Sequence, residues 1–151
     1  MIVGVSVGNR GSDAGQSTPM LEQIERRMGA LPSEMLVDGG YAQHAAIDEA
    51  TGKDVTLYAP VPRPRKGDAR DPHLPRDDDS DAVAAWRKRM ATDEAKSLYK
   101  QRAATAETVN ADAKSNRGLD HLAVRGLGKV LGSASLFVLT YDILRLIALG
   151  G

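Results

Sequence analysis

Short apolar runs alternate with helical patterns in the first part of the chain. The runs are rich in β-branched and aliphatic residues and predict three strands, at residues 1–7 (MIVGVSV), 34–37 (EMLV) and 55–59 (VTLYA). Residues 18–28 and 41–50 carry apolar side chains at helical spacing, and the glycines at 29 and 52 are expected to end these helices. This alternation of strands and helices predicts an α/β fold.

The first helix is expected to begin at Thr18, because a threonine cap before a proline is a common helix start. Its inward face would bury four apolar side chains, those of Met20, Leu21, Ile24 and Met28. Residues 9–16 (NRGSDAGQ) are rich in turn-forming residues and predict a loop.

Residues 60–81 are expected to be irregular. They contain five prolines, a group of basic residues at 63, 65, 66 and 70, and then acidic residues at 77, 78, 79 and 81. Such a segment cannot bury a core, which favours a mobile connection over an arm that contacts nucleic acid. A helix is expected over residues 81–90, with Trp86 as its only aromatic residue and its three basic side chains on the exposed side, Arg87, Lys88 and Arg89.

Residues 99–119 (YKQRAATAETVNADAKSNRGL) predict a polar helix, because alanines are frequent and neither glycine nor proline interrupts it before Gly118. In a straight helix, positions seven apart share a face, so Lys100, Glu107 and Lys114 would form one polar stripe. Taken alone, the stripe is typical of a solvated helix face with weak charge pairing.

The C-terminal part predicts a short helix at residues 120–124 and a long apolar helix at 126–149. Asp142 and Arg145 lie within the apolar run, three positions apart and able to pair. Because each would cost about 2.5–3.5 kcal/mol at the centre of a bilayer, we expect a buried or partner-facing helix and no membrane span.

The charges are unevenly distributed, although the net charge is zero. Residues 1–86 carry nine Lys or Arg against fourteen Asp or Glu, whereas residues 87–129 carry ten against five. A basic segment of this kind suits a binder of nucleic-acid phosphates, and a soluble, lysine-rich helix surface is the alternative. The chain is long enough for one domain, and the absence of cysteine excludes disulfides and thiol chemistry. We read no secretion signal and expect a cytoplasmic protein.

Asp38 is a candidate for chemistry, because it follows a predicted buried strand and precedes two glycines that permit close approach. The alternative is an Asp-Gly turn that caps the next helix. The three histidines do not lie at ligand spacing, and the glycines form neither a Walker loop nor a dinucleotide fingerprint.

The polar helix resembles the glutamate segment of the bacterial insertion-sequence DDE transposases. In that signature a Tyr, an Arg, a Glu and a Lys occur in fixed order, and the matching residues here are Tyr99, Arg102, Glu107 and Lys114. The gap between the Arg and the Glu is four residues rather than the three of many relatives, which in a straight helix places them about 140° apart. The segments LVDGGY (36–41), NRGL (116–119) and VRGLGKV (124–130) also resemble that family.

The resemblance implies a truncated RNase H-like fold of about three strands with flanking helices, followed by a helical part. Residues 1–59 would be the C-terminal part of the sheet, 60–81 the connection, and 82–151 the helical region. Two central strands of that fold would be missing, and we expect residues 1–7 to pair directly with residues 34–37.

The resemblance further implies metal-dependent cleavage and transfer of DNA strands. Asp38 and Glu107 would be catalytic ligands of Mg²⁺ or Mn²⁺. The DNA, at transposon ends and target, would be bound by Tyr99, Lys100, Arg102, Lys114 and Arg117. The family's first catalytic Asp has no counterpart, since Asp13 lies in a loop, so the chain alone would be inactive without a missing N-terminal half or a homodimer partner. The alternative is a non-catalytic DNA-binding or oligomerisation remnant.

Overall fold

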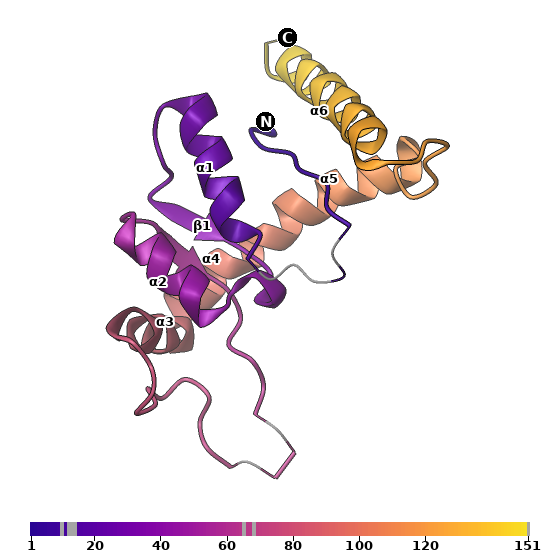
Figure 1. Cartoon of the computed structure of the whole chain (residues 1–151). Helices are drawn as coiled ribbons and strands as arrows, with labels where there is room; N and C mark the ends of the chain where they lie inside the picture. Colours follow the sequence, from indigo (N-terminus) through magenta and orange to yellow (C-terminus); the bar gives the residue numbers. More distant parts are fainter. Residues whose placement is uncertain (10, 12–14, 65, 68, 151) are drawn as a thin grey trace.

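A two-stranded parallel sheet lies at the centre of the molecule (Figure 1). The computed structural model describes residues 1–9, 11, 15–64, 66–67 and 69–150. β1 (Glu34–Leu36) pairs with β2 (Thr56–Tyr58), so that Met35 lies opposite Leu57, and α2 (His44–Gly52) connects them. The strands predicted at 34–37 and 55–59 are therefore confirmed within one residue at each end.

The other regular elements of the described chain are helices. α1 precedes the sheet, a short 3₁₀ turn η1 follows β1, and three helices follow β2, the second continuing through two π-helical turns. Their bounds are α1 Ser17–Met28, η1 Gly39–Tyr41, α3 Asp81–Ala91, α4 Asp93–Arg102, η2 Ala103–Glu107, α5 Thr108–Ala111, η3 Asp112–Asn116 and α6 Leu127–Gly150. The molecule is an α-rich α/β structure.

The core lies between the sheet and helices α1, α2 and α3. Its largest fully buried apolar side chains come from each of these elements, namely Leu21, Ile47, Val55, Leu57, Val83 and Trp86. The Trp86 indole N–H donates to the carbonyl of Ala59 at 3.2 Å, which joins α3 to the end of the β2 segment. Burial of such side chains contributes about 1.5–3 kcal/mol each and holds the layers together.

Several predicted helix ends are confirmed. Gly29 ends α1 in the left-handed conformation, with φ of 73°. The Ser80 hydroxyl accepts from the N–H of Val83 and caps α3. At the start of α1, however, Thr18 is not the cap: it lies inside the helix and donates to Glu49 on α2. Met28 is exposed rather than buried, because it lies in the last turn, beyond the core.

Residues 1–7 do not form the predicted strand. They lack regular secondary structure. Side chains of α1, and not a neighbouring strand, form hydrogen bonds with their backbone N–H and carbonyl groups. The Gln23 amide of α1 accepts from the N–H of Val5 at 2.7 Å and donates to its carbonyl at 3.2 Å. Arg27 donates to the carbonyl of Val3. The expected pairing with residues 34–37 is therefore wrong.

Arg87 is buried, contrary to the prediction of an exposed basic triplet. Its side chain is 3% exposed, and Nε donates to Oδ2 of Asp79 at 2.6 Å, where the carboxylate is 0% exposed. A second nitrogen donates to the carbonyl of Pro72 at 2.9 Å. Arg89 also lies inward, over the Tyr58 ring and bonded to the carbonyl of Leu57. α3 thus fastens the end of the irregular segment that was expected to be a mobile connection.

The C-terminal helix α6 lies apart from the core (Figure 1). None of its residues is fully buried, which rules out the buried helix considered from the sequence. Within the described residues, α6 alone is long and apolar enough to cross a membrane, by length and composition. Residues 120–124 form turns and bends instead of the short predicted helix.

Arg87→Ala should lower the free energy of unfolding by about 3–5 kcal/mol, because the Asp79 carboxylate would stay buried without its charge partner. Urea denaturation of the purified chain measures this change. Lys88→Ala, on the exposed side of the same helix, is the matched control and should change it by less than about 0.5 kcal/mol. Equal losses for the two variants would contradict the structural role of the pair.

The same pair should be lost in acid. Burial raises the pKa of the Asp79 carboxyl, but hydrogen bonds from Arg87 and from the N–H of Arg76 outweigh it, so the pKa is lowered overall. A lowered pKa in the folded state gives stability that is complete above the ordinary carboxyl pKa of about 3.9 and disappears as the pH falls through the folded value. In Arg87→Ala burial remains and the Arg87 hydrogen bond is gone, so the variant's Asp79 protonates at a higher pH than that of wild type. The difference in stability between wild type and Arg87→Ala should therefore be largest near neutral pH and shrink as the pH falls.

Candidate functional site

Asp38 lies at the carboxyl end of the first strand segment, directly after Val37. The Asp-Gly turn is present in part, because Asp38 is the N-cap residue of η1 and its carbonyl accepts from the N–H of Tyr41 at 2.9 Å. Its side chain makes no capping hydrogen bond. The carboxylate is 60% exposed and forms an ion pair with Arg102 of α4. A strand end and a helix separated by 64 positions thus meet at this carboxylate.

Tyr99 positions Arg102. Its hydroxyl donates to the carbonyl of Val37 at 3.2 Å and accepts from Nε of Arg102, also at 3.2 Å. The Tyr99 hydrogen bond raises the pKa of the Arg102 guanidinium; burial opposes this rise and the bond to Asp38 adds to it. Tyr99 therefore fixes α4 against the strand end and holds a permanently charged guanidinium at Asp38.

A π-helical turn lies between Arg102 and Glu107. In an α-helix residues four apart are in register, whereas in a π-helix hydrogen bonds join residues five apart. The turn η2 covers residues 103–107, so the four-residue gap between the Arg and the Glu coincides with a widened turn.

Threonines support this widened turn. The Thr105 hydroxyl donates to the carbonyls of Gln101 and Arg102, each at 3.2 Å, and the Thr108 hydroxyl donates to the carbonyl of Ala104 at 2.9 Å. Such bonds satisfy carbonyls whose helical partners have shifted and are common where helices deform.

A cavity of about 420 Å³ opens beside Asp38. The helix lines it with Arg102, Ala106 and Asn110, each four positions apart, and the N-terminal segment and β1 line the other side. Glu107 is exposed and is not among the lining residues. Asn110 was not anticipated from the sequence, although its spacing of eight residues from Arg102 would have placed it on the same helix face.

The predicted cations of this helix differ in their surroundings. Lys100 and Lys114 are exposed, but the π turns break the seven-residue repeat, so the straight stripe with Glu107 is not formed. Arg117 pairs with Asp112 at 3.5 Å. The helix therefore offers two lysines to solvent and keeps two arginines engaged with carboxylates.

The predicted ligands for a divalent metal ion are two carboxylates. Asp38 and Glu107 are hard carboxylate ligands, and Mg²⁺ is commonly held by one or two carboxylates, with water and phosphate oxygens completing its coordination. In the part of the chain that the structure describes, no group of three or more His, Asp or Glu side chains is close enough to hold a metal ion. Arg102 also competes for the Asp38 carboxylate, so a metal ion would have to displace that ion pair.

Comparison with known proteins gives one match. A family model described as the transposase DDE domain matches residues 65–147, more than half of the chain. The matched region contains the whole of the helix from α4 to η3 and excludes Asp38. No curated protein and no solved structure matches the chain.

Deletion of Ala104 should convert η2 into an ordinary α-helical turn and place Arg102 and Glu107 in register. Because the helix then recovers its i to i+4 hydrogen bonds, the melting temperature should stay the same or rise. Deletion of Ala85 is the matched control: it rotates Trp86 and Met90 of α3 by about 100° relative to the preceding turn and should unfold the chain. A large loss of stability on deletion of Ala104 would show that the π turn is required by packing.

Proposed function

The chain belongs to the transposase DDE domain family, and from this premise we propose that it takes part in metal-dependent cleavage and transfer of DNA strands during transposition of an insertion sequence. One observation carries the proposal. Asp38, which follows β1, forms an ion pair with Arg102 on the helix that continues to Glu107.

In this proposal Asp38 and Glu107 hold a divalent ion, Mg²⁺ or Mn²⁺. When bound, the ion would stabilise negative charge on phosphoryl oxygens during displacement at a DNA phosphodiester. With Asp38 holding an ion, Arg102 would be available to a DNA phosphate. Tyr99 keeps it within reach of the site through its bonds to the strand end and to Nε.

Lys100 and Lys114, with Arg117, contact the DNA backbone. Lysines and arginines supply phosphate contacts that do not depend on base sequence. Since no group of three or more His, Asp or Glu side chains among the described residues could hold a metal ion, strand cleavage is assigned to an assembly in which another segment or polypeptide supplies a further carboxylate.

The two-stranded parallel sheet supports the proposal that the chain is part of an RNase H-like fold. β1 pairs with β2 along one edge only, and the cavity beside Asp38 lies along its other side. Two-stranded sheets are marginal on their own, and an open strand edge offers backbone groups to a further strand. We propose that added strands extend the sheet at β1.

A second candidate is a DNA-binding and oligomerisation module that cleaves nothing. The Asp38–Arg102 ion pair favours it, because the pair neutralises the carboxylate that a metal ion would need. The exposed apolar residues of α6 would serve a homodimer, and they include Leu136, Leu139 and Ile147. Metal binding separates the two candidates.

Mn²⁺ binding, followed by electron paramagnetic resonance, should fall at least tenfold in Asp38→Asn and in Glu107→Gln. Arg102→Ala should instead increase the affinity, because it removes the cation that competes for Asp38. Asp54→Asn and Glu94→Gln, which alter exposed carboxylates outside the candidate site, are the controls and should leave binding unchanged. Failure of the wild-type chain to bind Mn²⁺ would favour the non-catalytic candidate.

Binding to duplex DNA should weaken when Lys100 and Lys114 are both replaced by alanine. Each lost phosphate contact should reduce the slope of log affinity against log salt by about 0.9, and duplexes of unrelated sequence should be affected alike. The charge-matched control is Arg26→Ala with Lys53→Ala, on α1 and α2. Fluorescence anisotropy at several salt concentrations measures both effects, and strong preference for one sequence would contradict backbone-driven binding.

A further inference from the structure

A second cavity, of about 390 Å³, lies where the irregular segment meets α2 and α3. Its lining contains four arginines and a histidine, namely Arg63, Arg70, Arg76, Arg87 and His44. The remaining lining residues are prolines on either side of Arg63, so no carboxylate of the described residues lines the cavity. We propose that this arginine pocket binds a phosphate group, supplied by a DNA backbone.

The floor of the arginine pocket is rigid. Arg87 is held by both oxygens of Asp79, at 2.6 and 3.3 Å, and by the carbonyl of Pro72. Its outer nitrogen lies 3.5 Å from Nε2 of His44. These contacts fix Arg87 and neutralise much of its charge, so it shapes the pocket and leaves the attraction of an anion to Arg63 and Arg76.

Carboxylates lie near the arginine pocket but do not line it. Asp71 accepts from the N–H of His73 at 2.9 Å, and Asp79 accepts from the N–H of Arg76 as well as from Arg87. Asp77 and Asp78 lie on the neighbouring surface with Arg70 and Arg76. The lining itself therefore presents guanidinium groups, whose planar donors match phosphate oxygens in pairs.

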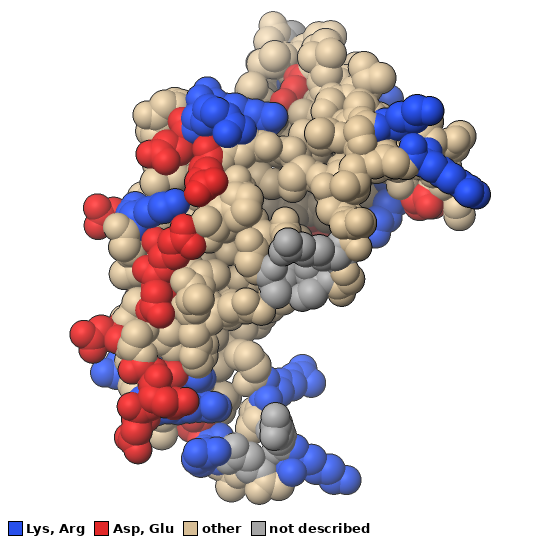
Figure 2. Space-filling model, viewed as in Figure 1, with Lys and Arg blue, Asp and Glu red and all other residues tan. Residues whose placement is uncertain are grey.

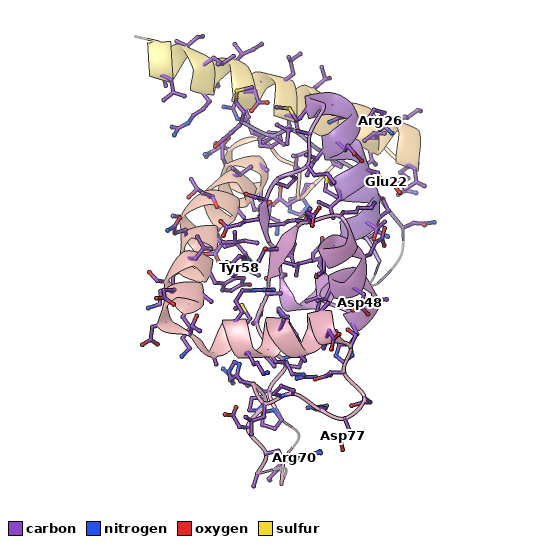
Figure 3. All side chains as sticks on the ribbon, turned by 90° about the vertical axis from the view of Figure 1, so that its left-hand side faces the viewer. Glu22, Arg26, Asp48, Tyr58, Arg70 and Asp77 are labelled. Carbon is purple, nitrogen blue, oxygen red and sulfur yellow. The ribbon has the colours of Figure 1, made fainter. Side chains whose placement is uncertain are left out.

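The walls that carry Arg63 and Arg76 are exposed and available to a large ligand. Pro62 and Pro64 restrict the backbone on both sides of Arg63, which reduces the entropy lost when it binds. Figure 2 shows Lys and Arg side chains over this projecting loop, and Figure 3 shows Arg70 on it, beyond α3.

The arginine pocket is connected to the Asp38 edge of the sheet. Because β1 and β2 are parallel, the irregular segment leaves the sheet at the same edge as Asp38. A Cβ built on Gly39 would lie 3.4 Å from Cγ of Pro60, so the two chain segments touch there. A DNA strand at Asp38 could thus continue over the arginine pocket. This step rests on the proposed function, whereas the phosphate chemistry of the pocket does not.

The test uses the full chain and the double variant Arg63→Ala with Arg76→Ala, both at exposed positions. For a 30-base-pair duplex of arbitrary sequence, the affinity should fall about tenfold and the salt slope by about one, as expected for one lost phosphate contact. The control pair Arg26→Ala with Lys53→Ala removes the same charge outside the arginine pocket and should have less than a twofold effect. Figure 3 shows Arg26 at the opposite end of the molecule from Arg70.

Pyrophosphate, titrated without DNA and followed by the Arg Nε–H signals in NMR, gives the second arm. If pyrophosphate shifts the Arg Nε–H signals of wild type but not those of the double variant, the pocket is a phosphate site. If the duplex competes with pyrophosphate for it, the phosphate that the pocket binds belongs to DNA. If wild type binds pyrophosphate but the double variant binds DNA as tightly as wild type does, the pocket binds a free phosphate ligand and the DNA assignment is wrong. If wild type binds DNA and the double variant matches the control pair in both arms, the arginine pocket is refuted while the proposed function stands. If wild type binds no duplex, the proposed function fails independently.

Discussion

Parallel pairing of β1 with β2 brings the carboxyl ends of both strands to one edge of the sheet, and the candidate chemistry is arranged along that edge. Asp38 follows the first strand, and the segment that carries the arginine pocket begins after the second. Tyr99 adds the third part, since its bond to the Val37 carbonyl fixes the Glu107 helix over the same edge. If the strands were antiparallel, these ends would lie on opposite sides of the sheet and could not share a ligand.

Local signals in the sequence predicted the elements well where the chain itself satisfies their requirements. Gly29 ends a helix because it adopts positive φ, and Ser80 begins one because its hydroxyl accepts a backbone N–H. Residues 1–7 have an equally clear strand pattern, but a strand also needs a partner at the right distance. The Gln23 side chain supplies that hydrogen bonding instead, and no local pattern reveals it.

The surroundings of charged side chains could be predicted least. Arg87, Lys88 and Arg89 are adjacent and chemically alike, yet Arg87 is buried because Asp79, from the irregular segment, meets it in the folded chain. Similarly, the extra residue between Arg102 and Glu107 coincides with a π turn, beside which threonine hydroxyls bond to backbone carbonyls. A sequence shows the charges and the extra residue, but tertiary contacts decide which arginine is buried and how the helix absorbs the insertion.

The N-terminal segment couples the sheet edge to α6. Its backbone is bonded to Gln23 and Arg27 on α1, and the N–H of Ile2 donates to Asp142 on α6 at 2.8 Å. Backbone groups held by these side chains cannot also pair with β1. Any rearrangement that adds this segment to the sheet must therefore break its bonds to α1 and release Asp142, which would leave α6 less firmly attached. Since α6 is apolar and largely exposed, completion of the sheet and coverage of α6 by a partner are expected to favour one another.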